Sequence, residues 1–332
     1  MWTCFFDDYL TFSSETLCSN TAHTVDLLFR LLGWKYAVDG DKAQSFSDAF
    51  TALGIQIDLC GFSKGFVQFL NTQKRVEELS SVISRLLDKG TMTVLESQKL
   101  RGRMQFADSQ FFGRIGKLCT KAISDHAFVH GAVKMNGECR RALHRFAGFL
   151  QESVPRKVQR TTGSTWYIFT DACYEPTSAC WKGGLGGFLV DSFGEQQQFF
   201  SHRLTDHELE RLGVPRKKTV IFEAELLAVL LAIKIWSEFL KAQQAVCYID
   251  NNSARDVSIS GVAKNDCAIV LLENLLMEEM KCTAYMWYAR VPSPSNISDG
   301  VSRGDTSLVG PHCIRADVSS ALASILQQLP VG

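Results

Sequence analysis

The run Trp166-Tyr-Ile-Phe-Thr-Asp171 is rich in β-forming residues and ends in an aspartate. The chain after it alternates between short β-rich runs and longer stretches with helical periodicity. Two more strands, an apolar helix, a strand, a helix and a last strand are predicted at 185–190, 196–200, 222–240, 245–249, 267–280 and 282–289. This order predicts an α/β domain in which a mixed five-stranded sheet is flanked by helices.

Four acidic residues occupy distinctive places in this pattern. Asp171 and Asp250 end two of the predicted strands, and open α/β sheets place their sites at the carboxyl ends of strands. Glu225 shares a helix face with small apolar residues that would pack on the sheet. Glu223 precedes Glu225 by two residues, which places the two side chains about 200° apart around the helix, so Glu223 is expected to point to solvent. Asp299 follows the last strand.

Carboxylates that converge at one end of a sheet repel one another unless cations hold them together. Oxygen ligands without a cysteine or histidine partner select Mg²⁺ or Mn²⁺. Two such ions, about 4 Å apart, are the usual device for phosphodiester cleavage. Any one of these acids alone would be interpreted as a turn residue or a helix cap, but the order Asp, Glu, Asp, Asp predicts a metal site.

These motifs resemble the ribonuclease H family over roughly residues 165–305. The matching segments are Tyr-Ile-Phe-Thr-Asp171, Gly183-Gly-Leu-Gly-Gly-Phe-Leu189, Glu225-Leu-Leu-Ala, Tyr-Ile-Asp250-Asn and Asn296-Ile-Ser-Asp299. The resemblance implies a ribonuclease H-like fold with Asp171, Glu225, Asp250 and Asp299 as catalytic and metal-binding residues. It also implies Mg²⁺- or Mn²⁺-dependent endonucleolytic hydrolysis of the RNA strand of RNA·DNA hybrids.

The loop before the last acid departs from the family pattern. The family often has a histidine there, whereas this chain reads Arg290-Val-Pro-Ser-Pro-Ser-Asn296. A catalytically inactive protein that binds nucleic acid or a partner therefore stays open as an alternative. A different nuclease or strand-transfer enzyme on the same fold is a second alternative. The phrase from Val291 to Arg303 most resembles reverse transcriptases of DIRS-type retroelements.

The N-terminal half resembles the end of a reverse transcriptase. Phe5-Phe-Asp-Asp8 matches the aromatic-x-Asp-Asp hairpin of that family, which implies that Asp7 and Asp8 are a polymerase-site remnant. The expected parts are an α+β palm remnant (1–70), a helical, basic thumb or connection (71–150), a linker (151–164), the ribonuclease H-like domain (165–305) and a tail (306–332). Only four residues precede Phe5, so the palm is expected to be truncated and DNA polymerisation by this chain alone is not expected.

The helical region is also the basic part of the chain. Within this region, Thr93-Val-Leu-Glu96 is a capping-box pattern that predicts the start of a second helix. Residues 99–160 contain thirteen Lys or Arg against four Asp or Glu, a net charge of +9, in a chain whose net charge is zero. Such a block is typical of solvated helix faces or of contact with a phosphate backbone, and the reverse transcriptase resemblance favours the latter. Expected nucleic-acid contacts are Lys99, Arg101, Arg103, Arg114, Lys117 and Lys121, with Arg216 and Lys217 in a second basic loop.

Composition narrows the cellular setting and the partners. The longest apolar run, Leu226 to Ile233, is far shorter than a membrane span. Eleven cysteines without a Cys-x-x-Cys pair indicate reduced thiols in an intracellular protein, nuclear or cytoplasmic, and argue against a zinc site built on cysteine pairs. The expected partner is an RNA·DNA hybrid or another nucleic-acid duplex, and no membrane. An intact reverse transcriptase is a further partner to consider.

Overall fold

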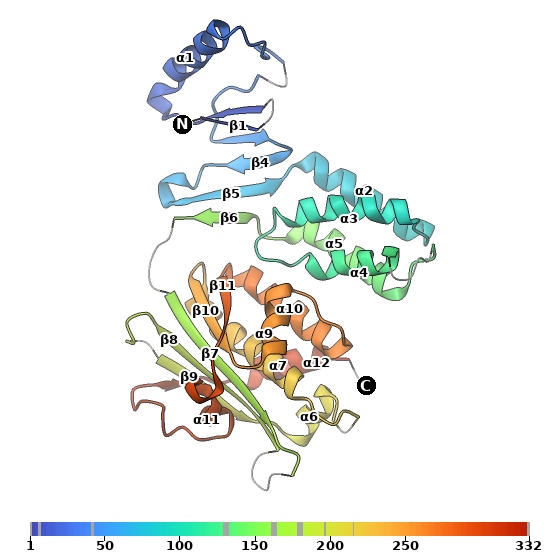
Figure 1. Ribbon diagram of the computed structural model, residues 1–332, viewed down its shortest axis with the longest axis vertical. Helices are drawn as coiled ribbons and strands as arrows, with labels where there is room; N and C mark the ends of the chain where they lie inside the picture. Colours follow the sequence, from blue (N-terminus) through green and yellow to red (C-terminus); the bar gives the residue numbers. More distant parts are fainter. Residues whose placement is uncertain are drawn as a thin grey trace. The chain divides into compact units, whose positions relative to one another are not determined.

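The computed structural model describes residues 2–5, 8–40, 43–128, 133–160, 165–177, 182–195, 197–214 and 216–330 (Figure 1). The chain divides into two compact units. The first unit comprises residues 1–78 and 155–160, and the second comprises residues 79–154 and 161–332. The expected domain boundaries stay a prediction, although residues 156–159 of the expected linker form a strand of the first unit.

The first unit contains two antiparallel sheets. In the smaller one, β1 (Trp2–Phe5) pairs with β2 (Asp8–Thr11) so that Phe5 lies opposite Asp8. A hairpin is therefore present at the aromatic-x-Asp-Asp motif, while Asp7 lies outside the described residues. The larger sheet has the order β3-β4-β5-β6. Its strands are β3 (Ala49–Ala52), β4 (Ile55–Asp58), β5 (Phe66–Asn71) and β6 (Arg156–Gln159).

Aromatic side chains form much of the packing in the first unit. Phe29, in α1 (Cys18–Leu31), is buried and its ring contacts Tyr9, Trp34 and Tyr36 at centroid distances of 4.8, 5.7 and 5.0 Å. Two short 3-10 helices, η1 (Glu15–Leu17) and η2 (Phe62–Lys64), complete this unit. Its apolar packing is local rather than gathered in one large core.

Helices fill the N-terminal part of the second unit. After α2 (Gln73–Lys89), which begins in the first unit, come α3 (Val94–Asp108), α4 (Lys117–Phe128) and α5 (Gly137–Glu152). Helix α3 begins at the predicted capping box, because the Thr93 hydroxyl accepts from the Glu96 backbone N–H and the Glu96 carboxylate accepts from the Thr93 N–H. Met104, Leu143 and Phe146 are fully buried between these helices.

A six-stranded mixed sheet organises the rest of the second unit, in the order β11-β10-β7-β8-β9-β12. Strands β7 (Thr165–Tyr174), β8 (Gly183–Asp191) and β9 (Gln197–Arg203) form the antiparallel meander. Strand β10 (Gln244–Ile249) runs parallel to β7, and β11 (Tyr285–Arg290) runs parallel to β10. The five predicted strands are present, and the two-residue β12 (Ile314–Arg315) adds a sixth that the sequence did not reveal.

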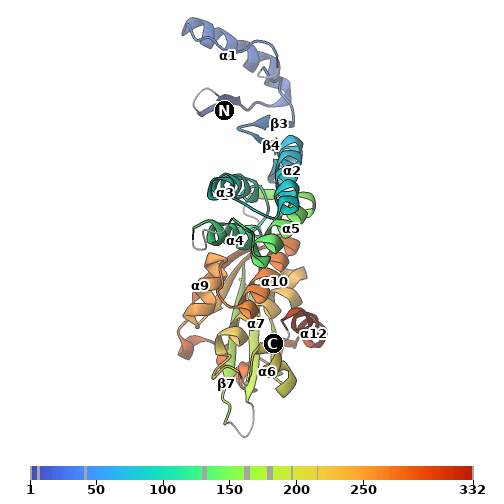
Figure 2. The same cartoon turned by 90° about the vertical axis from the view of Figure 1, so that its right-hand side faces the viewer.

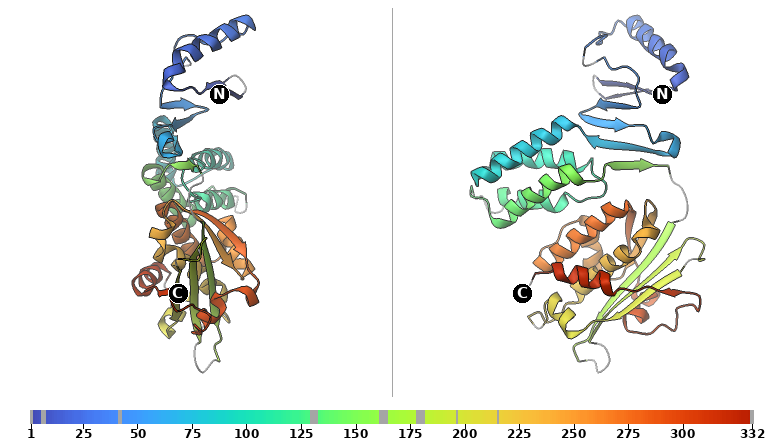
Figure 3. Two further views of the ribbon diagram at one scale, coloured as in Figure 1. Left: turned by 90° about the vertical axis from the view of Figure 1, so that its left-hand side faces the viewer. Right: turned by 180° about the vertical axis from the view of Figure 1, so that it is seen from behind.

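Helix α7 (Ile221–Ile235) is the centre of the core. Residues 223–233 are all buried, because β7 and β8 cover one side of the helix and α10 (Asp266–Cys282) covers another. Figure 2 shows α7, α10 and α12 (Ser319–Gln328) on the helical side of the sheet, and Figure 3 (left) shows the strands from the other side. The remaining elements are α6 (Asp206–Leu212), α8 (Ser237–Leu240), α9 (Asn252–Ser260), η3 (Ser293–Ser295) and α11 (Ser298–Ser302). The predicted α/β class, with a mixed sheet flanked by helices, is confirmed.

Within the described residues, every helix is too short or too polar to cross a lipid bilayer.

Candidate metal centre

Three carboxylates from three different elements meet in the second unit. Asp171 lies in β7, Glu225 in the first turns of α7, and Asp250 directly after β10. One carboxylate oxygen of each lies within 4.8 Å of those of the other two. Asp171 and Glu225 are each only 3% exposed, whereas Asp250 is half-buried. Three oxygen ligands at this spacing can surround a divalent cation.

Strand register explains why two of these acids are neighbours. Ile249 in β10 lies opposite Thr170 in β7, so Asp250 and Asp171 both come one residue later on adjacent parallel strands. The expectation that Asp171 ends its strand is wrong, because β7 continues to Tyr174 in its pairing with β8. The end of β10 therefore falls beside the interior of β7.

Burial and mutual repulsion raise the pKa values of two members of this cluster. Burial raises the pKa of Asp171 to about 7; a hydrogen bond from Ser302 opposes the shift, and the charges of Asp250 and Asp299 add to it. Burial and the charge of Asp171 raise the pKa of Glu225 well above its usual range. The Oε2 atom of Glu225 is buried, and no described residue donates a hydrogen bond to it. A buried acceptor that lacks a donor is costly, and a cation would satisfy it.

Asp299, the fourth predicted acid, lies at the rim of this cluster. Its side chain is 44% exposed, and its Oδ1 is 3.5 Å from a guanidinium nitrogen of Arg303. Asp299 is close enough to raise the pKa of Asp171 and of Glu225 through its charge. The structure thus brings together three of the four predicted residues and places the fourth beside them.

Polar side chains fasten α11, the short helix that carries Asp299, to strand β7. The Asn296 side-chain amide donates to the Thr170 carbonyl at 3.0 Å, and the Ser298 hydroxyl donates to the Phe169 carbonyl at 2.8 Å. The Ser302 hydroxyl donates to Asp171 Oδ2 at 2.5 Å. None of these three residues was identified as functional from the sequence. Their signal was the clustering of polar residues around Asp299, in a segment whose contacts lie more than a hundred residues away.

Gly186 in β8 makes room for the same helix. A Cβ atom at this position would lie 2.4 Å from the Ser302 backbone nitrogen and 2.8 Å from the Ser298 carbonyl oxygen. Both are backbone atoms that cannot move without displacing α11. The glycine at position 186 therefore allows α11, the helix that carries Asp299, to pack closely against β8.

Glu223 is not exposed, contrary to expectation. It is 4% exposed, its Oε1 accepts from Lys217 Nζ at 2.5 Å, and the Asn265 side chain donates to the same oxygen at 3.2 Å. The expectation failed because α10, which begins just after Asn265, covers the side of α7 that a lone amphipathic helix would present to water.

The predicted nucleic-acid contacts fall into two groups. The side chains of Lys99 and Arg103 on α3 and of Arg216 are exposed. The others include residues with partners in the same unit: Arg114 with Glu279, Lys117 with Ser260, Lys121 with Asp125 and Lys217 with Glu223. Arg101 is half-buried on α3. Their contact with nucleic acid stays a prediction.

Solved structures with a similar chain path include ribonucleases H. The N-terminal RNase H domain of a Mycobacterium tuberculosis protein, fused to maltose-binding protein, matches with a TM-score of 0.32 and 11% identity over 44% of this chain and 96% of its own. RNase H1 from Halobacterium salinarum matches with a TM-score of 0.30 and 14% identity, over 44% and 98%.

A foamy viral protease-reverse transcriptase, solved with an RNA/DNA hybrid, matches over more of the chain. Its TM-score is 0.37 at 15% identity, over 88% of this chain, which spans about a third (35%) of the viral protein's length. No protein-family model matches the sequence, and a search of curated proteins finds no match either. With likenesses this distant, the site residues themselves carry the functional proposal.

Proposed function

We propose that this chain is a Mg²⁺- or Mn²⁺-dependent endonuclease that hydrolyses the RNA strand of RNA·DNA hybrids. The observation that carries the proposal is the meeting of Asp171, Glu225 and Asp250 within 4.8 Å. Their ligand atoms are carboxylate oxygens, which favours Mg²⁺ or Mn²⁺ over softer metals. The family resemblance of the sequence supplies the substrate class.

The residues present fit such a site. Glu225 has a buried oxygen without a partner among the described residues, and burial together with the charges of the neighbouring acids raises the pKa values of Asp171 and Glu225. Asp171, Glu225 and Asp250 would hold the metal, and Asp299 would supply a fourth carboxylate from the rim. When bound, two divalent ions activate a water molecule and stabilise the departing oxygen.

The chain's own residues prepare the site before metal or substrate arrives. The Ser302 hydroxyl fixes the orientation of the Asp171 carboxylate through Oδ2. Asn296 and Ser298 hold α11 against β7, and this keeps Asp299 beside the other three acids. Such preorganisation removes the cost of rearranging these groups during the reaction.

Substrate recognition would rest on backbone shape and charge. The 2′-hydroxyl groups displayed in a wide, shallow minor groove distinguish RNA from DNA. Among the predicted contacts, Lys99, Arg103 and Arg216 have exposed side chains that would meet a phosphate backbone. Such contacts are indifferent to sequence, so cleavage without sequence specificity is expected.

The resemblances of the N-terminal half complete the proposal. We infer that this chain derives from a retroelement reverse transcriptase of the DIRS type. In this assignment Asp7 and Asp8 are a remnant of the polymerase site, and residues 71–150 are the thumb or connection. An intact reverse transcriptase is a proposed partner. The hairpin that pairs Phe5 with Asp8 supports the assignment of the aromatic-x-Asp-Asp motif.

Incubation of the full chain with end-labelled RNA·DNA hybrid tests the function. With Mg²⁺ we expect internal cuts in the RNA strand that leave 3′-hydroxyl and 5′-phosphate ends, and none in EDTA. Asp250→Asn should abolish cleavage. Asp256→Asn is the matched control, because Asp256 lies on the neighbouring helix α9, is 63% exposed and pairs with the adjacent Arg255. Duplex DNA of the same sequence should stay intact.

The outcomes separate the alternatives. Equal cleavage by the wild type and Asp250→Asn would remove the assigned site. Tight hybrid binding without any metal-dependent cleavage would favour the inactive binding protein, an alternative that the lack of histidine in 290–298 keeps open. Cleavage of duplex DNA instead of the hybrid would favour another nuclease on this fold.

A further inference from the structure

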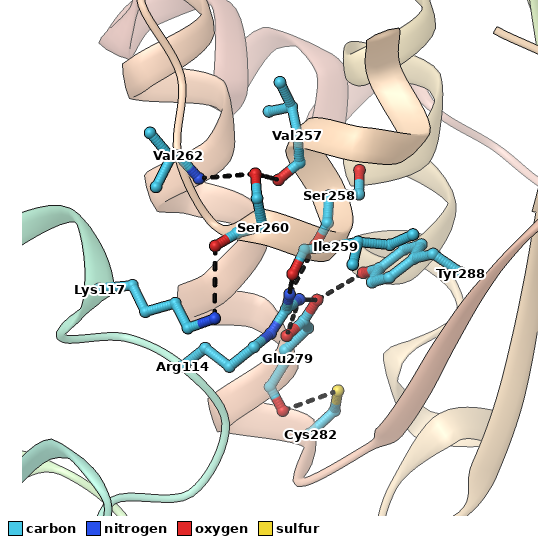
Figure 4. Close-up of polar contacts among 10 residues, drawn as sticks. All are labelled: Arg114, Lys117, Val257, Ser258, Ile259, Ser260, Val262, Glu279, Cys282 and Tyr288. Carbon is cyan, nitrogen blue, oxygen red and sulfur yellow. Dashed lines mark hydrogen bonds and ion pairs between the residues drawn. The ribbon is translucent and has the colours of Figure 1, made fainter. Parts of the chain in front are cut away.

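Arg114, in the loop between α3 and α4, reaches across to the nuclease part of the second unit. Its side chain is 24% exposed, and Nη1 donates to the carbonyls of Ser258 and Ile259, both at 2.6 Å. Its Nη2 donates to both carboxylate oxygens of Glu279, at 2.9 and 3.1 Å (Figure 4). One guanidinium therefore joins the last turn of α9 to α10.

A buried tyrosine extends this contact to the sheet. The Tyr288 hydroxyl, on β11, donates to Glu279 Oε1, and the Arg114 guanidinium lies 5.7 Å from the Tyr288 ring centroid. The Glu279 side chain is 4% exposed and Tyr288 is 6% exposed. Burial raises the pKa of the Tyr288 phenol well above its usual range, so the phenol keeps its proton and donates it. The buried Glu279 charge is thus paired and hydrogen-bonded.

Helix α9 leads directly from this contact to the metal centre. It begins at Asn252, two residues after Asp250, and the Asn251 side chain caps it by accepting from the Ala254 N–H at 3.1 Å. It ends at Ser260, whose carbonyl accepts from Lys117 Nζ at 3.4 Å. At 1.5 Å per residue, α9 is about 13 Å long. Its C-terminal carbonyls favour a positive charge, which Arg114 supplies.

We propose that Arg114 is a positioning residue for Asp250. It acts through α9, which it holds at the end opposite to Asp250, and through Tyr288, which lies opposite Cys247 of β10, three residues before Asp250. The inference rests on the proposed metal-dependent function. It gives the helices of residues 79–154 a role inside the nuclease rather than only on the nucleic acid.

Other contacts join these helices to the nuclease part without touching α9. Arg145 on α5 pairs with Glu273 on α10 at 2.8 Å, and Phe112 packs edge-on against Tyr285 with centroids 5.2 Å apart. Docking of the helices therefore has several supports, whereas within the described part of the chain the side-chain hydrogen bonds from these helices to the last turn of α9 come from Arg114 and Lys117. This difference separates a positioning role from simple attachment.

The test compares Arg114→Ala, Arg114→Lys and Arg145→Ala in the full chain. Mg²⁺ binding is measured without substrate, by calorimetry and by the rise in unfolding temperature, and then as the Mg²⁺ concentration that half-saturates hybrid cleavage. Loss of groups that orient metal ligands typically weakens metal affinity about 10-fold or more. We expect a shift of about that size for Arg114→Ala, a smaller one for Arg114→Lys and none for Arg145→Ala.

The lysine variant keeps the inference testable if Arg114→Ala fails to fold, because lysine can still pair with Glu279 but cannot also reach both α9 carbonyls. Unchanged Mg²⁺ affinity in the folded Arg114 variants, despite lower unfolding temperatures, would overturn the positioning role and leave only attachment. An equal shift in Arg145→Ala would overturn it too. A wild type that binds no Mg²⁺ would overturn both the metal site and this inference. Mg²⁺ binding without cleavage would overturn the proposed nuclease activity, whereas the Mg²⁺ affinities of the variants would still decide the role of Arg114.

Discussion

The two larger sheets of this chain differ sharply in how deeply their residues are buried. In the six-stranded sheet, eight of the nine residues of β8 are buried, and helix α7, which packs on this sheet, is buried from Glu223 to Ile233. In the four-stranded sheet of the first unit, Ile57 is the one buried residue of β3 to β6, and every residue of β5 is half-buried. The six-stranded sheet can therefore impose a fixed geometry on its side chains. The four-stranded sheet has much less packing with which to do so.

The position of the acidic cluster follows from this difference. Burying carboxylates beside one another is unfavourable, and strained groups persist only where the surrounding structure over-determines them. Glu225 lies on the helix with the deepest burial in the molecule, and Asp171 on the central strand that packs against it. The cluster is therefore found where packing is dense enough to hold it.

A pair of leucine substitutions gives the largest expected contrast between the two sheets. Leu230→Ala removes a fully buried side chain from α7 and should cost about 2–5 kcal/mol in the free energy of unfolding, because a cavity remains. Leu70→Ala removes a half-buried side chain from β5 and should cost about half as much or less, since less apolar area is lost. Denaturant unfolding followed by circular dichroism measures both. Equal losses would contradict the contrast.

Much of the second unit could be predicted from local sequence. Short local patterns were enough to predict five strands, the capping box at Thr93 and the order of the acids, because strand and helix patterns depend on neighbours in the chain. The proximity of Asp171 and Asp250 followed from placing both strands side by side. Glu225 followed from its share of the helix face that meets the sheet.

What could not be predicted depends on partners distant in sequence. Glu223 is buried because α10 covers it, and a lone helix gives no sign of such a cover. Strand β6 exists through its pairing with β5, about ninety residues earlier, as Phe66 opposite Gln159 shows. Arg114 was assigned to the basic surface, because its charge is visible in the sequence and its contact with Glu279 is not.

Stability in the absence of metal should fall as the pH rises, because of the acidic cluster. The folded-state pKa of Asp171 is raised from 3.8 to about 7. A raised pKa means that the stabilisation is complete below about 3.8 and is lost as the pH rises through about 7. At about 1.4 kcal/mol per pKa unit, the loss from this group reaches about 4 kcal/mol at most.

Unfolding in EDTA between pH 4 and pH 8 measures this effect. Asp171→Asn should flatten the pH dependence and raise the stability at pH 8, whereas Asp256→Asn should leave the wild-type profile unchanged because its side chain is 63% exposed. Added Mg²⁺ should stabilise the wild type most at high pH, since metal and protons compete for the same oxygens. A wild type that gains stability from pH 4 to pH 8 in EDTA would contradict the prediction.

Two glycines give the smallest effect in stability: Gly186 lies within β8 of the six-stranded sheet, and Gly61 lies in the turn between β4 and β5 of the four-stranded sheet. In Gly186→Ala the new Cβ meets backbone atoms of α11, the nearest at 2.4 Å, whereas in Gly61→Ala it meets the ring of half-buried Phe66, at 2.2 Å. Overpacking against backbone should cost about 1–3 kcal/mol. A half-buried ring can turn aside, so Gly61→Ala should cost less.

Cleavage of the labelled hybrid separates these two variants more clearly than stability does. Gly186→Ala moves the helix that carries Asp299 and should slow cleavage strongly, while Gly61→Ala alters a sheet that contributes none of the four acids and should leave the rate of the folded protein unchanged. If Gly186→Ala cleaves at the wild-type rate, either α11 accommodates the methyl group or Asp299 is dispensable. Asp299→Asn decides between these, because only a dispensable Asp299 would leave its rate unchanged as well.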